Sequence, residues 1–284
     1  MSKNNGRTNP PGSTGREAQA WNAIAESWHS WIPMMRKWYA PATDLMLDLA
    51  RIGVGSRILD IAAGDCDQSM AAATRVGPQG YVLAVDVSKG LLEIGAQFAR
   101  DAGFRNIDTR VMDGGNLDLP ENCFDAVICR FALMYLPDPE AALRGMKRVL
   151  KADGRVSLVV YGTSGSPEFS RAVSVVRRHL RLSETPSPAH SLGELAALEQ
   201  ALAEGGFAGI EIHPMTLPIR MASAEDCVRY LQATSPTLKE LTSTLSPDDR
   251  KVVWDDVQKA LTAYEGNDGF EVLHEVIVAA GTAT

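Results

Sequence analysis

Three acidic residues follow short apolar segments of the sequence and could hold a polar ligand. The first, Asp60, lies in the apolar run 57–61 and precedes Ala62 and Gly64 in a turn of small residues. Small residues let the backbone turn tightly and approach a ligand at the start of the next helix. A carboxylate beside such a turn suits an ammonium group. The same turn also fits an ordinary strand-to-helix connection, so alone it is a weak signal.

The second acidic residue, Asp86, follows the apolar run 81–85 and precedes Val87 and Ser88. An acidic residue about 20 positions after a glycine turn can accept hydrogen bonds from the hydroxyls of a ribose. Asp86 or Ser88 could instead cap a helix that begins near Lys89. The two roles are compatible, with Asp86 on the ribose and Ser88 at the helix start.

The third acidic residue, Asp113, lies between Met112 and Gly114. An aspartate here can accept from the exocyclic amine of an adenine while Met112 packs on the ring. A turn aspartate before glycine is the alternative explanation. All three aspartates fall at the carboxyl ends of successive expected strands, where open α/β sheets bind their ligands. Together they predict a site for S-adenosylmethionine.

The segments that must position these residues alternate between strands and helices. Short β-rich runs separated by helical stretches occupy 57–61, 81–85, 109–112, 124–129, 155–161, 210–213 and 270–279. Such alternation predicts an α/β fold with a mostly parallel, seven-stranded sheet and helices on both faces. Residues 1–15 are expected to be a disordered tail and residues 16–51 an N-terminal helical lid. The α/β domain then spans 52–284, with a helical cap inserted at about 220–266.

The stretch from Phe124 to Pro139 combines a strand, an aromatic-rich loop and a Pro-Asp turn, and a hairpin follows at 148–155. In these features the chain resembles the class I S-adenosylmethionine-dependent methyltransferases, above all the branch related to the ubiquinone and menaquinone biosynthesis methyltransferases. The resemblance implies a Rossmann-like methyltransferase fold. It also implies S-adenosyl-L-methionine as cofactor, S-adenosyl-L-homocysteine as product, and transfer of a methyl group to a small molecule.

The resemblance also implies roles for individual residues. Asp60 and Gly64 would line the methionine end of the cofactor, and Asp86 would hold the ribose. Arg130 and Phe131 would lie beside the sulfonium. The full set of expected cofactor-binding residues is Asp60, Ala62, Gly64, Asp86, Val87, Met112, Asp113, Gly114, Arg130 and Phe131.

The sequence departs from the family pattern in two places. In the first loop, Ala62 and Cys66 replace two of the usual glycines, and the later hairpin has Ala-Asp-Gly at 152–154 instead of Pro-Gly-Gly. Ala62 is a mild change, whereas Cys66 adds a side chain near the cofactor. This leaves open an alternative function, a non-methylating or regulatory S-adenosylmethionine-binding protein of the same fold.

The acceptor side is expected to involve the aromatic lid. Trp28, Trp31 and Tyr39 are the lid residues that we expect near the substrate, because aromatic faces attract cations such as a sulfonium. Packing of an amphipathic helix explains the same residues, and Pro33 and Pro41 are expected to interrupt that helix.

Methylation of a hydroxyl, a phenol or an acidic carbon would require a general base. The candidate catalytic residues are Tyr39, Tyr135 in the loop after the fourth strand, and His190. A capping or surface role is the alternative for His190. The aromatic lid and the cap favour an apolar or aromatic acceptor in a closed pocket, methylated on carbon, oxygen or nitrogen.

Composition disfavours other classes of function. The formal net charge of −7 disfavours nucleic acid as a partner, and the missing G-x-G-x-x-G motif disfavours a nicotinamide-dependent oxidoreductase. No motif suggests a metal, and no apolar run has the ~18 residues of a membrane span. The four cysteines form no C-x-x-C pair, which fits a cytoplasmic protein.

Overall fold

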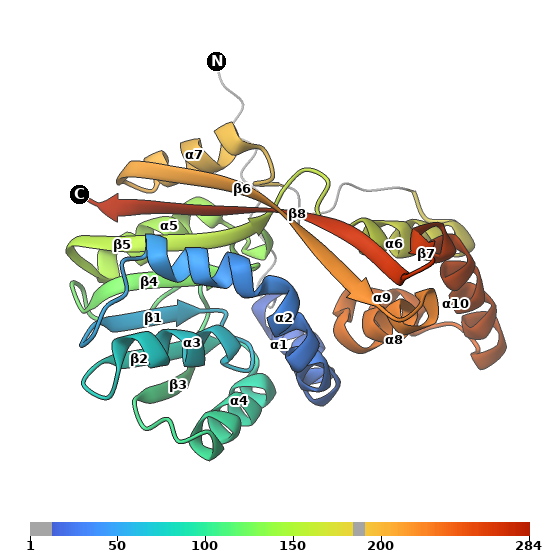
Figure 1. The fold of residues 1–284 in the computed structure, drawn as a ribbon, viewed down its shortest axis with the longest axis horizontal. Coiled ribbons are helices and arrows are strands. Elements are labelled where there is room, and N and C mark those ends of the chain that lie inside the picture. Colours follow the sequence, from blue (N-terminus) through green and yellow to red (C-terminus); the bar gives the residue numbers. More distant parts are fainter. Residues whose placement is uncertain (1–12, 184–190) are drawn as a thin grey trace.

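The computed structural model describes residues 13–183 and 191–284. Its centre is a mixed sheet in the order β3-β2-β1-β4-β5-β8-β6, with a short strand β7 paired to β8 (Figure 1). The strands are β1 (Arg57–Ile61), β2 (Tyr81–Asp86), β3 (Ile107–Val111), β4 (Phe124–Arg130), β5 (Leu150–Tyr161), β6 (Phe207–Met221), β7 (Glu265–Gly266) and β8 (Gly269–Ala283). The expected α/β fold is therefore confirmed, and the eighth strand is the two-residue β7.

The first five strands are parallel, and β8 is antiparallel to both β5 and β6. Strand β1 is central, between β2 and β4, and four of its five residues are buried. Since β1, β2, β3 and β4 run in one direction, the loops that follow them gather at one edge of the sheet. This edge carries all three aspartates found in the sequence.

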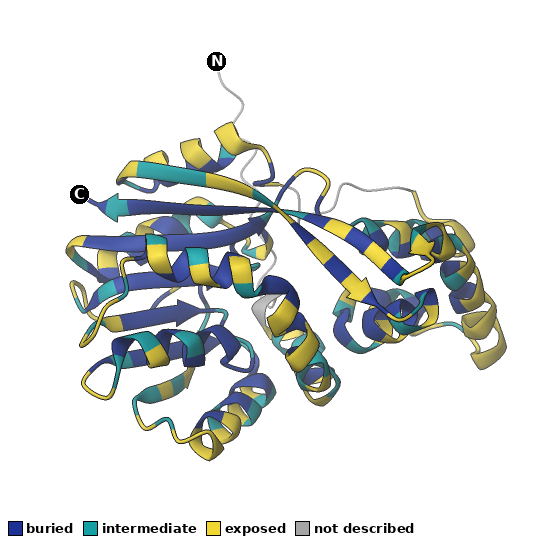
Figure 2. Ribbon diagram, in the orientation of Figure 1, coloured by how far each residue is buried: buried dark blue, intermediate teal, exposed yellow. Residues whose placement is uncertain are grey.

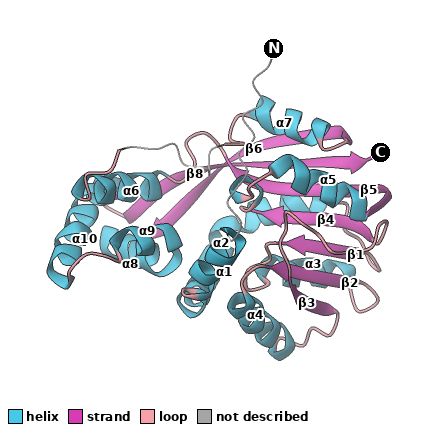
Figure 3. Cartoon of the chain, turned by 180° about the vertical axis from the view of Figure 1, so that it is seen from behind, coloured by secondary structure: helices cyan, strands magenta, loops and turns pink. Residues whose placement is uncertain are grey.

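Helices cover both faces of the sheet (Figures 1 and 3). They are α1 (Ser13–Asn22), α2 (Ala25–Leu49), α3 (Asp67–Val76), α4 (Lys89–Asp101), α5 (Pro139–Val149), α6 (Pro167–His179), α7 (Leu195–Glu204), α8 (Ala224–Thr234), α9 (Pro236–Thr242) and α10 (Pro247–Leu261), with 3₁₀ turns at Leu133–Tyr135 and Thr262–Tyr264. Side chains alternate across each strand, so Ile58 packs under α2 and α3 while Leu59 packs under α5. The result is one large apolar cluster on each face of the sheet, and Figure 2 shows the inner strands mostly buried.

Local signals in the sequence explain where several helices begin. The hydroxyl of Ser88 accepts a hydrogen bond from the backbone N–H of Leu91 and caps α4. The carboxylate of Asp138 accepts from the N–H of Ala141, and Pro139 occupies the first turn of α5, where its missing N–H costs nothing. Ser88 is thus the helix cap that the sequence suggested.

Helix α2 corrects one expectation. Pro33 and Pro41 lie inside a single helix of 25 residues instead of dividing it. A proline in a helix interior costs roughly 3 kcal/mol and bends the axis. Figure 1 shows the two halves of α2 running in different directions. Both prolines are exposed, and an almost continuous buried face that includes Met35 and Met46 keeps the helix intact.

Strand β6 is much longer than the expected 210–213. It contains Pro214 and Pro218, residues that are uncommon inside strands. Because β6 is the edge strand of the sheet, prolines there remove no hydrogen bond that a neighbouring strand needs. The outer halves of β6 and β8 extend beyond the sheet as a twisted two-stranded ribbon (Figure 1).

That ribbon carries the helical cap. Helices α8, α9 and α10 lie between β6 and β8 in sequence, as expected for 220–266, and α6 packs against α9 and α10 in the same lobe. The cap therefore also includes α6, a helix that precedes the insertion in the sequence. The predicted tail mostly lies outside the described residues, although Ser13 to Gly15 already belong to α1. No helix in the described part of the chain combines the length and apolarity of a membrane span.

Candidate functional site

The loop between β1 and α3 has an unusual backbone. Ala62, Gly64 and Cys66 all have left-handed φ angles, of 54°, 57° and 64°. For residues with a side chain this conformation costs about 1 kcal/mol or more. A Cβ atom built on Gly64 would meet no atom within 4 Å, so open space adjoins the loop there. The loop thus has the shape that lets a ligand approach its backbone closely.

Asp86 joins this loop to the next one. Its Oδ2 accepts from the N–H of Gly64 at 2.9 Å, and its Oδ1 accepts from the N–H of Ser88 at 2.7 Å. Burial raises the pKa of Asp86, and these backbone hydrogen bonds oppose the increase. A carboxylate oxygen can accept more than one hydrogen bond, so both oxygens of Asp86 can still accept a hydrogen bond from a ribose hydroxyl. Val87 follows at the half-buried start of the loop.

Asp60 is fully buried beneath the loop. Its two oxygens accept from Ser69 Oγ at 2.5 Å and from Gln68 Nε2 at 3.0 Å. Burial, with a smaller contribution from the charge of Asp86, raises the pKa of Asp60 to about 7. Asp60 therefore fixes the start of α3, and its expected contact with the methionine end stays a prediction.

The third loop follows β3. Met112 donates its N–H to the carbonyl of Asp86 at 2.9 Å, and Asp113 Oδ1 accepts from the N–H of Gly115 at 2.8 Å. A Cβ atom on Gly114 would lie only 2.6 Å from Cγ2 of Ile61, so this position requires glycine. The loop is therefore packed tightly against the end of β1, and the three predicted segments form one continuous edge.

The N-terminal lid contacts this edge at several points. Asn22, at the end of α1, accepts from the N–H of Gly90 at 2.7 Å and from the hydroxyl of Ser88 at 2.8 Å. His29 Nδ1 lies 2.7 Å from Asp65 Oδ2 in the loop after β1. Neither Asn22 nor Asp65 was among the predicted site residues, although Asp65 lies in the turn of small residues after β1.

Arg130 lies at the end of β4, and its side chain turns toward α2 and α3. Its guanidinium donates to Asp67 Oδ2 at 3.0 Å and to the hydroxyl of Thr43 at 2.7 Å. Arg36 Nε donates to the other oxygen of Asp67 at 2.6 Å. Arg130 thus connects the lid to the sheet through hydrogen bonds. Because its side chain has these partners, only its backbone and Phe131 would contact a sulfonium.

Negative charge is concentrated around these loops. The charges of Asp60 and Asp86 act on one another, as do those of Asp65 and Asp67. Burial is the main reason that the pKa of Asp65 rises to about 6, and the charge of Asp67 adds to it. Such a site favours a cationic ligand, because a nearby positive charge relieves the repulsion between carboxylates. A sulfonium and an ammonium group together meet that requirement.

An aromatic group lies beside this charged region. Phe131, which follows Arg130, has a left-handed φ of 57° and stacks on Tyr161 with ring centroids 4.6 Å apart. The ring of Tyr39 meets Phe131 edge-on at 4.8 Å. The structure therefore brings Phe131 and Tyr39, predicted from different parts of the sequence, into contact.

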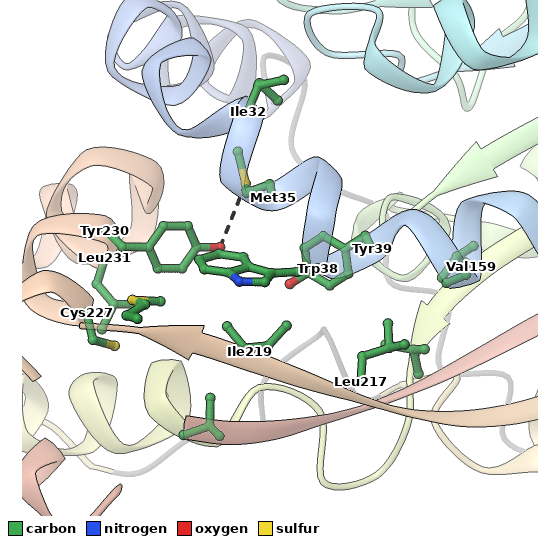
Figure 4. Packing of buried hydrophobic residues seen from close by; sticks show 14 of the residues in the cluster. Ile32, Met35, Trp38, Tyr39, Val159, Leu217, Ile219, Cys227, Tyr230 and Leu231 are labelled. Carbon is green, nitrogen blue, oxygen red and sulfur yellow. Dashed lines mark hydrogen bonds between the residues drawn. The ribbon is translucent and has the colours of Figure 1, made fainter. Parts of the chain in front are cut away.

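The remaining predicted residues are more scattered. Trp28 packs edge-on against Trp21 of α1, whereas Trp31 packs edge-on against Tyr230 of α8. Tyr135 is 45% exposed in the 3₁₀ turn after β4. Figure 4 shows the neighbouring face of α2 packed against β6 and α8. His190 lies outside the described residues, and those residues contain no cluster of three or more potential metal ligands.

Comparison with known proteins identifies the fold and the family. Residues 58–154 match a methyltransferase domain family. A ubiquinone/menaquinone biosynthesis C-methyltransferase from Hahella chejuensis, named UbiE, is 30% identical over 193 residues, which are 66% of this chain and 74% of that protein. The chain belongs to the class I S-adenosylmethionine-dependent methyltransferases.

Further relatives of this methyltransferase chain match over a shorter range. A demethylmenaquinone methyltransferase from Listeria welshimeri is 29% identical over 134 residues, 47% of this chain and 57% of that protein. The chain therefore spans little more than half the length of this relative. Among solved structures, the YcgJ protein from Bacillus subtilis aligns with a TM-score of 0.58 at 22% identity, over 86% of this chain and 98% of that one. This likeness shows the shared fold.

Proposed function

We propose that the chain is an S-adenosylmethionine-dependent methyltransferase that transfers a methyl group to a small apolar or aromatic metabolite by in-line displacement. The proposal rests mainly on the Asp86 carboxylate, which holds the Gly64 and Ser88 loops together at the carboxyl edge of the sheet. A carboxylate in this position, beside the open space at Gly64, suits the hydroxyls of a ribose that lies between the two loops.

When bound, the cofactor supplies a methyl group that is already strongly electrophilic. The chain has to orient the two reactants and exclude water. Asp86 would orient the ribose, and the buried carboxylates would favour the cationic end. Phe131 would lie along the sulfonium, and α1 and α2 would cover the site through Asn22 and His29.

The acceptor is proposed from the walls of the site. Phe131, Tyr161 and Tyr39 form a contiguous group of aromatic rings next to the expected sulfonium, and Tyr135 is 45% exposed in the 3₁₀ turn that follows β4. Aromatic walls bind apolar or aromatic molecules and place few polar groups around them. The relatives are named as enzymes of quinone biosynthesis, which is consistent with an aromatic acceptor.

Calorimetric titration with S-adenosylmethionine and, separately, NADH tests this proposal. We expect binding of S-adenosylmethionine alone, weakened about 30-fold in Asp86→Ala because a charge-assisted pair of hydrogen bonds is lost. Asp118→Ala, which removes an exposed carboxylate, is the matched control and should bind normally. Absence of S-adenosylmethionine binding to the wild-type chain would refute the proposal.

The alternative is a protein of the same fold that binds the cofactor without transferring its methyl group. Cys66 suggested this possibility, but its side chain is fully buried, and burial raises the pKa of its thiol well above the ordinary value. A protonated, buried thiol is a poor nucleophile, so Cys66 gives no chemical support to a different reaction. A screen of aromatic acceptors by mass spectrometry separates the two functions, since only the methyltransferase produces methylated acceptor and S-adenosylhomocysteine.

A further inference from the structure

Three polar side chains from distant parts of the sequence form a buried chain of hydrogen bonds. The hydroxyl of Tyr39 lies 3.0 Å from Nδ1 of His274. The other ring nitrogen, Nε2, lies 2.9 and 3.0 Å from the two carboxylate oxygens of Glu168. Ser166 Oγ also donates to Glu168, at 2.8 Å. Tyr39 belongs to the lid, His274 to β8 and Glu168 to the cap helix α6, and no more than 5% of any of the three is exposed.

The hydrogen-bond partners determine which atoms carry protons. Burial alone would raise the pKa of Glu168, but the positive charge of a protonated His274 and hydrogen bonds from His274 and Ser166 lower that pKa below its usual value. Glu168 is therefore an ionised carboxylate that only accepts hydrogen bonds, and Nε2 of His274 must donate to it. In a neutral imidazole Nδ1 is then the acceptor, and the hydroxyl of Tyr39 donates to it. In that tautomer, Nδ1 of His274 can take the proton of Tyr39.

The position of Tyr39 connects this chain to the site. Its ring contacts Phe131, the residue directly after the carboxyl end of β4. His274 and Glu168 lie behind Tyr39, on the side of the cap. A buried ion pair or polar network is a weak source of stability, because apolar residues of similar size pack as well. Stability alone therefore gives little reason for three polar groups here.

We propose that Tyr39, His274 and Glu168 form a proton relay that deprotonates the methyl acceptor. The inference rests on the proposed methyltransferase function. In this relay Tyr39 is the catalytic residue, whose hydroxyl would take the proton of the acceptor, and His274 and Glu168 are positioning residues that act through it. The relay is useful only for an acceptor atom that carries a proton, as in a hydroxyl, a phenol or an acidic C–H group.

The acceptor's proton moves to the oxygen of Tyr39 while the proton of Tyr39 moves to Nδ1 of His274, and Glu168 stabilises the resulting imidazolium. The acceptor's electron pair forms the bond to the methyl carbon, and the electrons of the broken carbon–sulfur bond stay on sulfur as a neutral thioether. The proton on His274 returns to solvent through Tyr39 after the product leaves. Because burial raises the pKa of Tyr39, its hydroxyl is protonated at rest and serves as a relay.

Other titratable groups face the relay, and the hydroxyl of Tyr39 also interacts with two of them, Tyr161 and Tyr230. They are Tyr161 from β5 and Tyr230 and Cys227 from α8. Burial is the main cause of a raised pKa in each of them, so all three stay neutral near physiological pH. A proton that leaves the acceptor is therefore held between His274 and Glu168.

The protonation of His274 can be measured without cofactor or acceptor. In protein labelled with ¹⁵N in its five histidines, NMR of the imidazole nitrogens distinguishes the two neutral tautomers from the imidazolium. The spectrum of His274→Gln assigns the signal. We expect protonated Nε2 and unprotonated Nδ1 at about pH 7.5. An imidazolium, or a neutral ring protonated at Nδ1, would overturn the relay, because neither can accept the proton of Tyr39.

Proton transfer from a ligand is tested with 4-nitrophenol, an aromatic acceptor analogue whose ionisation changes its absorbance. With S-adenosylhomocysteine bound, we expect the wild-type chain to lower the pKa of the added phenol by about one unit. Tyr39→Phe keeps the aromatic packing and should abolish this shift. Tyr264→Phe, the control, removes a hydroxyl from a ring whose contacts are Phe270 and Arg171, and should retain the shift. Equal ionisation with the wild-type and Tyr39→Phe chains would overturn the proposal.

The two proposals can fail separately. Absence of S-adenosylmethionine binding in calorimetry would contradict the methyltransferase function, whatever the tautomer of His274. If the cofactor binds but His274 is an imidazolium, the relay alone is wrong. If His274→Gln fails to fold, the conservative Tyr39→Phe variant still decides the question, because it removes one oxygen atom from a ring that keeps its contact with Phe131.

Discussion

His29 Nδ1 of the lid lies 2.7 Å from Asp65 Oδ2 of the loop after β1. The two residues are 36 positions apart in the sequence, and Asp65 is almost fully buried. With Asn22 on Ser88 and Gly90, this contact fixes the N-terminal helices over the expected cofactor edge. The lid is therefore attached directly to the loops that would hold the ligand.

Loss of the His29 contact should loosen the lid. In His29→Gln we expect faster amide hydrogen exchange across α1 and the first turns of α2, because Asp65 loses its partner from the lid. Exchange in β1 and β4 should not change. Ser30→Ala is the control, since the Ser30 hydroxyl bonds only to the carbonyl of Ser27 in the same helix. Unchanged protection of α1 in His29→Gln would mean that other contacts hold the lid.

Cofactor binding should release protons. Asp60 and Asp65 have pKa values raised to about 7 and about 6, and a cationic ligand stabilises their ionised forms. The complex then binds fewer protons than the free protein, so the affinity for S-adenosylmethionine should rise with pH between about 5.5 and 7.5.

Calorimetry in two buffers with different ionisation enthalpies measures this release directly. We expect release of a fraction of a proton at about pH 6.5 in the wild-type chain, and a smaller release in Asp60→Asn, whose amide does not titrate. Proton uptake on binding would contradict the electrostatic description of the site.

The two arginines that share Asp67 should contribute unequally to stability. The side chain of Arg130 is only 11% exposed, whereas that of Arg36 is 48% exposed. Arg130→Met leaves a buried carboxylate and the hydroxyl of Thr43 without one partner and should cost about 2–4 kcal/mol of unfolding free energy. Arg36→Met, the matched substitution of the more exposed arginine on the same carboxylate, should cost less than about 1 kcal/mol, because Arg130 still pairs with Asp67. Urea denaturation measures the unfolding free energy of both variants. Equal losses would contradict the larger contribution of the buried Arg130.

The four cysteines should differ in reactivity. Cys66, Cys129 and Cys227 are buried, whereas Cys123 is half-buried. Since attack on a thiol reagent requires an accessible thiolate, titration of the native protein should show one fast thiol, and unfolding should expose the other three. Cys123→Ser should abolish the fast phase. A fast phase that survives in Cys123→Ser but disappears in Cys66→Ala would restore a chemical role for the cofactor loop.

The sequence by itself determined the sheet that carries the cofactor edge. Apolar runs bounded by glycine, and aspartates at the ends of those runs, are local signals, so Asp60, Asp86 and Asp113 could be assigned to neighbouring strand ends. The structure places all three loops together, joined by the hydrogen bonds of Asp86 to Gly64 and Met112. The start of α4 at Ser88 was equally local.

Only the tertiary structure decided the continuity of α2, the length of β6 and the partners of the polar groups. Prolines are strong local signals against helix and strand, and they misled here because burial of Met46 and the edge position of β6 outweigh them. His274 occupies an inward position of β8 between the buried residues Val272 and Val276. That alternation signals that the histidine needs a buried partner, but which residue supplies it depends on the cap and the lid folding against the same strand, which no local pattern encodes.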